Sequence, residues 1–239
     1  MPATYDFSLN RNEIIKAALQ KLGVLEAGGT PTSDQYTDGA TAFNSLIKHL
    51  QTKGLPLWSI KTKVVTFTAS QASYNSTTHL SIERPLKVTN IILTRTSDST
   101  IIPPLLQMSR EEYLSLGKPS ATGIPTSFYV NYNQATIDII FYPTPSTSVA
   151  SDYTATMYYQ RPFADFDSST DVPDFPQEWT LCLIYQLAVT IAPDYGITGT
   201  THYSKLEEKA NELLEDLLSF NTDGMSISFV PDIHNGYRY

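Results

Sequence analysis

The stretch PQEWTLCLIYQLAVTIAPDYG, residues 176–196, predicts a helix that is buried on most of its sides. Pro176 opens it, where a missing N–H costs little because first-turn N–H groups lack partners, and Pro193 disrupts its end. Two adjacent stripes are apolar and comprise Trp179, Leu183, Leu187 and Ile191, with Ile184, Ala188 and Ala192 beside them. A helix this apolar requires other elements packed around it.

The segment after it predicts a second, amphipathic helix that starts near Thr200 or Thr201. Its apolar positions repeat at four, three, four and three residues, at Leu206, Ala210, Leu213, Leu217 and Phe220. The opposite, solvated face carries the acidic residues Glu207, Glu208, Glu212, Glu215 and Asp216. Catalysis by these carboxylates is not expected, because their side chains face water.

The N-terminal region predicts two more helices. In the first, Asn10 and Glu13 form a capping box and Gly23 ends the helix. Ser33 is the predicted cap of the second, which stops before Gly54 and Pro56. Its apolar stripe has the heptad spacing of a bundle seam: Tyr36, Ala40, Phe43, Ile47 and Leu50.

Between these helix pairs the pattern changes to β-strands. Five stretches are rich in β-branched and aromatic residues: 60–69, 87–96, 127–132, 135–142 and 152–160. Asn133-Gln134 predicts a hairpin turn between the third and fourth stretches. Residues 109–116 predict a short helical turn capped by Ser109.

The order of elements predicts an α+β protein. We expect an antiparallel four-helix bundle built from both chain ends, residues 1–59 and 176–222, because neither pair can bury its stripes alone. Residues 60–162 are then an inserted antiparallel β domain, a sandwich or barrel, and 163–175 a linker rich in Asp, Ser and Pro. Residues 223–239 form an extended C-terminal tail.

Composition and charge argue against tight nucleic-acid binding and against membrane insertion. The net charge is −8 and no dense Lys/Arg patch occurs, whereas proteins that neutralise phosphates carry a basic face. Like charge is compatible with a wall past which DNA slides. The longest apolar stretch is too short and too polar to span a bilayer, and no secretion signal is visible.

Motifs for catalysis, metal or cofactor binding are not found, so we expect no catalytic, cofactor-binding or metal site. The four histidines, His49, His79, His202 and His234, lack zinc spacing. Cys182 lies in an apolar run, as a core thiol does. Aromatic residues near 128–132, 141–142 and 158–159 suit cross-strand packing better than a stacking platform for sugars or bases.

The C-terminal tail has the pattern of a docking segment. Its seven apolar or aromatic anchors are Met225, Ile227, Phe229, Val230, Ile233, Tyr237 and Tyr239. Burial of each is worth about 1.5–3 kcal/mol, which roughly cancels the cost of about 1–2 kcal/mol for ordering each residue. We therefore expect the tail to be poorly ordered in the free subunit and extended on a neighbour, where strand addition and avidity contribute. A frayed terminus is the alternative.

Two helical motifs resemble a known family. Residues 13–24, EIIKAALQKLGV, resemble the opening helix of podovirus head-to-tail adaptors, the tail accessory factors, which ends in Ala-Leu-x-x-Leu-Gly. Residues 176–179 (PQEW), Leu187-Ala188 and residues 191–196 (IAPDYG) resemble the later helix of that family, and the β insertion resembles its larger, tail tubular protein A type members.

The resemblance implies a non-enzymatic virion subunit at the head–tail junction, assembled in the host cytoplasm. Such subunits form a ring, usually of twelve copies, between the portal protein and the tail nozzle or tail fibre proteins, and DNA passes through without sequence-specific binding. The tail would then dock on the portal, and the acidic helix face could line the channel or merely face water. A tail-associated peptidoglycan or polysaccharide hydrolase and a carbohydrate-binding module are the alternatives.

Overall fold

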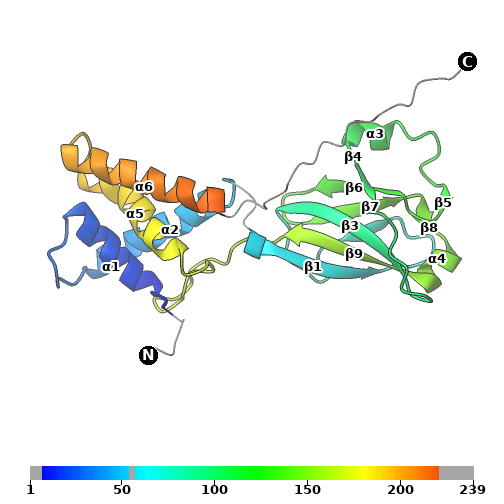
Figure 1. Ribbon diagram of the computed structural model, residues 1–239, viewed down its shortest axis with the longest axis horizontal. Coiled ribbons are helices and arrows are strands. Elements are labelled where there is room, and N and C mark those ends of the chain that lie inside the picture. Colours follow the sequence, from blue (N-terminus) through cyan, green and yellow to red (C-terminus); the bar gives the residue numbers. More distant parts are fainter. Residues whose placement is uncertain (1–6, 54–56, 221–239) are drawn as a thin grey trace, which may run out of the picture.

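The computed structural model describes residues 7–53 and 57–220 and has a helical part at one end and a β part at the other (Figure 1). The long helices are α1 (Arg11–Leu22), α2 (Ser33–Leu50), α5 (Trp179–Ile191) and α6 (Thr201–Phe220). Two 3₁₀ turns accompany them, η1 (Leu57–Ser59) before the first strand and η2 (Ala192–Tyr195) after α5.

Helix ends follow local capping chemistry. Asn10 and Glu13 form the predicted capping box of α1, and Gly23 takes the left-handed conformation (φ 82°) that ends it. The cap of α2 is Thr32, one residue before the predicted Ser33, because Gln35 stands three residues after Thr32 and completes a capping box. Helix α5 begins at Trp179 rather than Pro176; a turn precedes it, with the Trp179 N–H donating to the Pro176 carbonyl (3.0 Å).

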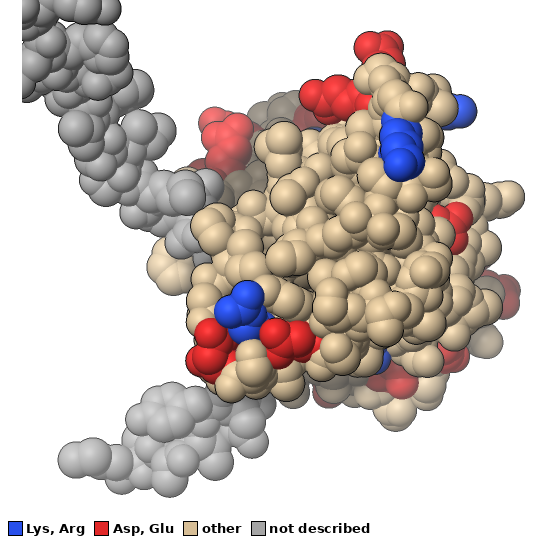
Figure 2. Space-filling model, turned by 90° about the vertical axis from the view of Figure 1, so that its right-hand side faces the viewer, with Lys and Arg blue, Asp and Glu red and all other residues tan. Residues whose placement is uncertain are grey.

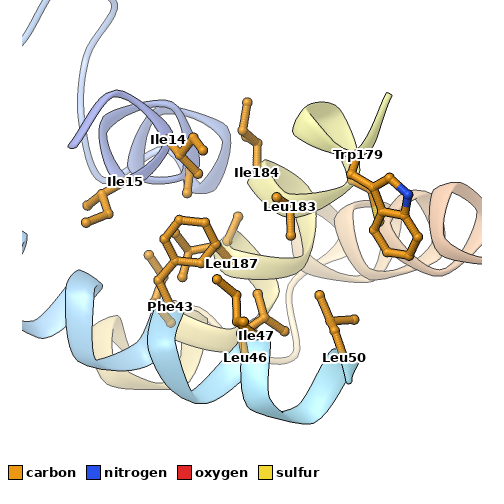
Figure 3. Packing of buried hydrophobic residues seen from close by; sticks show 14 of the residues in the cluster. Ile14, Ile15, Phe43, Leu46, Ile47, Leu50, Trp179, Leu183, Ile184 and Leu187 are labelled. Atoms are coloured by element: carbon orange, nitrogen blue, oxygen red, sulfur yellow. The ribbon is translucent and has the colours of Figure 1, made fainter. Parts of the chain in front are cut away.

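The four long helices share one hydrophobic core, so both ends of the described chain contribute to it. Helix α5 lies at its centre and packs against α1, α2 and α6, whereas α2 and α6 make at most marginal contact. This differs from the cyclic contacts of a regular four-helix bundle, and the reason is the apolar surface of α5 on most of its sides. Figure 3 shows side chains of α1 and α2 converging on it, with Ile14 and Phe43 beside Leu183 and Leu187.

The β part is built from two facing sheets and a small third one. A three-stranded antiparallel sheet has the order β1-β9-β3, formed by Ile60–Thr66, Tyr153–Gln160 and Lys87–Arg95. A four-stranded sheet has the order β2-β7-β6-β4, formed by Ser73–Asn75, Ile137–Tyr142, Ser127–Tyr132 and Leu106–Met108. Strands β5 (Thr122–Gly123) and β8 (Thr144–Pro145) pair separately.

Both larger sheets bury their inner faces in one second core. It unites Val65, Ile91 and Met157 of one sheet with Phe128 and Ile139 of the other. The hairpin predicted at Asn133-Gln134 is confirmed, with β6 and β7 antiparallel. The pairing is not wholly antiparallel: β4 pairs with β6 and β5 with β8 in parallel, since the chain passes through longer connections between them.

Two short helices complete the β part. Helix α3 (Arg110–Leu114) is the predicted turn, with Ser109 and Glu112 forming a capping box. Helix α4 (Thr147–Asp152) was not expected from the sequence; it sits where Ser146 accepts from the Val149 N–H and caps a short Ser/Thr-rich segment.

Candidate interaction surfaces

The helical period of α6 places its acidic residues on the exposed side of the helix. Leu206, Ala210 and Leu214 face the core, so the intervening positions point outward. All five predicted acidic residues are exposed: Glu207, Glu208, Glu212, Glu215 and Asp216. Lys209 lies among them and forms an ion pair with Glu212 (2.8 Å). A hydrogen bond from Lys209 to Glu212, with the charges of Glu212 and Asp216, raises the pKa of this lysine.

The predicted docking tail cannot be placed. Its seven anchors, Met225, Ile227, Phe229, Val230, Ile233, Tyr237 and Tyr239, lie outside the described residues, which end at Phe220. The structure does place the end of α6, where Leu217 and Leu218 pack against the same core as Trp58, which precedes β1. Helix α6 therefore ends near the junction of the helical part with the β part (Figure 1).

The segment 161–175 connects the two parts and also packs against the helices. Phe163 and Phe166 are buried in the helical core, and Phe166 stacks on Phe43 with ring centroids 4.6 Å apart. Asn44 of α2 accepts from the Phe166 N–H (2.9 Å) and donates to its carbonyl (3.3 Å). The polar composition of the segment concealed this role, although its three phenylalanines at 163, 166 and 175 were a usable signal.

An ion pair joins the two ends of segment 161–175, between the helical part and the β part. Arg161 binds Asp174 through both carboxylate oxygens, with Nη2 2.7 Å from Oδ1 and Nη1 in close contact with Oδ2. Partial burial would raise the pKa of Asp174, but the hydrogen bonds and charge of Arg161 outweigh it and lower that pKa. In the same segment, Phe163 and Phe175 pack against each other and against Trp58, and Phe175 also packs against Trp179.

The free end of the β part is almost without charge. Segments 64–82, 119–137 and 139–151 contain no Asp, Glu, Lys or Arg. Figure 2 shows the result, a broad neutral surface with charged groups at its margins. Arg95 at the end of β3 pairs with Asp98 (3.5 Å) and Asp152 (3.4 Å). Depletion of charge is a feature of protein–protein interface cores.

The edges of the three-stranded sheet differ in how they are covered. The outer edge of β3 is occupied, because the N–H groups of Ile102 and Leu105 donate to Leu93 and Ile91 (both 2.9 Å). The outer edge of β1 has no such partner within residues 7–53 and 57–220. Lys61 and Thr62 of this strand are exposed, and Val64 is 55% exposed.

Cys182, His79 and His202 lie in different parts of the fold. Burial raises the pKa of the Cys182 thiol to about 12, so it stays protonated at neutral pH. His202 contacts the Lys21 carbonyl (2.9 Å), and His79 accepts from the Asn75 N–H (3.0 Å). In the described part of the chain, no group of three or more His, Cys, Asp or Glu side chains is arranged to hold a metal ion.

The aromatic residues of the sheets do not form a continuous exposed platform. Phe128 and Phe141 are a buried cross-strand pair, and Tyr129 stacks on Tyr113 of α3 with centroids 4.9 Å apart. Tyr132 is 42% exposed, and its hydroxyl accepts from the Val88 N–H (3.3 Å). This arrangement corresponds to the cross-strand packing predicted from the sequence.

Two grooves lie on the helical part. An open polar groove of about 450 Å³ is lined by Arg11, Tyr36 and the hydroxyls of α2. A small apolar groove is lined by Phe7, Val172, Phe175 and Leu183, and both Phe7 and Val172 are more than half exposed. None of the described helices has the length and hydropathy that a membrane span requires.

The fold and surfaces thus define a two-part α+β protein with exposed acidic, neutral and strand-edge surfaces. Comparison with family models identifies it further: residues 10–225 match the model described as SU10 adaptor protein, and the chain belongs to this family. The match covers both helical ends and the β insertion. A search of curated proteins found no match.

Proposed function

We propose that this protein is a structural adaptor of a bacteriophage virion. The observation that carries the proposal is the family match, which extends over residues 10–225 and so includes the helical part, the β part and the connecting segment 161–175. A virion adaptor binds other virion components, and surfaces that make contacts rather than a reacting cleft suit this role.

The finer proposal is a head-to-tail connector ring of the tail accessory factor type, assembled in the host cytoplasm. In it about twelve copies join the portal to the tail nozzle or tail fibres around the DNA channel. A closed ring needs two different, complementary patches on each subunit. The helical core, residues 1–59 and 176–222, would build the ring. The β domain, residues 60–162, would contact lateral neighbours or the nozzle through its neutral end.

The acidic surface of α6 is proposed to line the channel, where like charge lets DNA pass without sequence-specific binding. The test replaces Glu208 and Glu215 with lysine and measures DNA retention by assembled rings against salt. We expect stronger, salt-dependent retention, because added cations release phosphate counterions. Glu111→Lys, at an exposed position of α3, is the control. Equal effects of both changes would place the acidic surface outside the channel.

Residues 223–239 are proposed to dock on a neighbour, with the portal as the favoured partner. The experiment mixes the purified full chain with purified portal complex and records the mass and image of the assembly. We expect a ring on the portal, and we expect deletion of residues 223–239 to weaken it. The anchor change Ile233→Asp with Tyr237→Asp should reproduce the loss, whereas His234→Ala with Asn235→Ala should not. Unchanged portal binding after the deletion would rule out docking by the tail.

A further inference from the structure

We propose that the open edge of β1 accepts residues 224–230 of an adjacent copy as an added antiparallel strand, which leaves Ile233, Tyr237 and Tyr239 of the same tail for the portal. This inference rests on the proposed ring and names the contact between its subunits. It starts from the seven residues of β1, Ile60–Thr66, which pair on one side with β9 and on the other side with nothing in the described chain. An unpaired row of N–H and C=O groups is a template for another strand.

The neighbouring edges leave β1 as the longest acceptor. Residues 101–105 already cover β3 on the other side of the same sheet. In the four-stranded sheet the outer strands β2 and β4 have three residues each. Strand addition gains affinity from main-chain hydrogen bonds in proportion to the paired length, so β1 offers more than twice the length of either.

The donor matches this acceptor in length and in the alternation of its side chains, and at Met225 it meets the buried Val65. Residues 224–230 read GMSISFV, with apolar residues at every second position. Pro231 follows directly, and because proline has no N–H it ends a strand ladder. In the register that pairs Gly224 with Thr66 and Val230 with Ile60, Met225 lies opposite Val65. That face is the inner one, since Val65 is 1% exposed.

Charge restricts which strands fit. Lys61 and Lys63 share the inner face with Val65, and lysines at a sheet edge discourage indiscriminate pairing. The tail carries Asp223 and Asp232 on either side of the donor segment. A donor flanked by acidic residues is favoured over a second copy of β1, which would set lysines against lysines.

The short connection between α6 and the donor segment indicates that the donor comes from another copy. Helix α6 ends near the junction, on the side where β1 begins (Figure 1). An antiparallel donor must instead enter at the Thr66 end, about 20 Å along the strand. The three residues 221–223 extend about 10 Å at most. The chain's own tail could run only parallel to β1, which is the less stable pairing in a sheet that is otherwise antiparallel.

Disulfide trapping between two variants that each carry one added cysteine tests the proposal. Thr62→Cys and Ser228→Cys face each other in the stated register, and the native Cys182 is buried and does not interfere. The two full-length variants are mixed with purified portal, oxidised and run on a non-reducing gel. We expect a two-chain product, about tenfold above the control pair Ser204→Cys with Ser228→Cys, because a disulfide requires Cβ atoms within about 4.5 Å.

Deletions separate this inference from the proposed function. Removing residues 232–239 keeps the donor and should leave the two-chain product unchanged, whereas removing 224–230 should lower subunit association about as far as losing the whole tail. A variant that carries both Thr62→Cys and Ser228→Cys is oxidised in parallel. If rings form on the portal but the cross-link between chains does not, or if the cross-link forms only within a chain of the double variant, the strand addition is wrong and the adaptor role stands. If no multi-chain assembly forms, both are wrong.

Discussion

Gly39 of α2 lies in close contact with Ile15 of α1. A Cβ atom built on Gly39 would lie 2.7 Å from Cγ2 and 3.3 Å from Cγ1 of Ile15, whose side chain is fully buried. Ile15 is β-branched and therefore stiff at χ1, so it has little freedom to move away. This close approach explains why a glycine occupies the middle of α2, although alanine has the higher intrinsic helix propensity.

Gly39→Ala is expected to destabilise the helical part despite that propensity. Overpacking costs about 1–3 kcal/mol, and the gain in helix propensity returns about 1 kcal/mol. The net loss is therefore about 1 kcal/mol. In an Ile15→Ala background the clash is gone, and the same change should stabilise by up to about 1 kcal/mol. The two backgrounds should differ by about 2 kcal/mol, a coupling that a double-mutant cycle measures.

Urea unfolding followed by tryptophan fluorescence is the assay. Both tryptophans of the chain, Trp58 and Trp179, belong to the helical core, so the signal reports that part of the molecule. Ile15→Ala alone is the reference for the second background, since the cavity itself costs about 2–5 kcal/mol. If Gly39→Ala stabilises the protein equally in both backgrounds, close helix packing is not the reason for this glycine.

Three further outcomes are expected. Asn10→Ala should lower the free energy of unfolding by about 1 kcal/mol through loss of the α1 cap, whereas an equal loss on Asn10→Ser, which can still cap, would contradict this. The lowered pKa of Asp174 gives stability that is present above its unfolded pKa and disappears as pH falls through the folded one. The free energy of unfolding, measured with urea at a series of pH values, should therefore fall less steeply below about pH 4 in Asp174→Asn than in the unchanged protein. Equal slopes for the two proteins would refute the ion pair. Cys182, with its pKa raised to about 12, should react with a thiol reagent at pH 8 only on unfolding; rapid labelling of the folded chain would show that it is accessible.

The sequence alone determined features set by local chemistry and periodicity. Three such features depend on neighbouring residues, and the structure confirms them: the capping box of Asn10 and Glu13, the start of α6 near Thr200 or Thr201, and the hairpin at residues 133–134. The outward direction of the acidic residues of α6 likewise follows from its 3.6-residue period. These features are readable because the groups that interact are only a few positions apart.

Only the tertiary structure decided how distant segments meet. It places α5 at the centre of the helical core, packs Phe163 and Phe166 of an apparently polar connection against α2, and pairs Arg161 with Asp174. It also leaves the edge of β1 open while residues 101–105 cover β3. Strand order and helix neighbours depend on which of many possible packings buries the apolar surfaces best. The pattern of residues along the chain does not specify that packing.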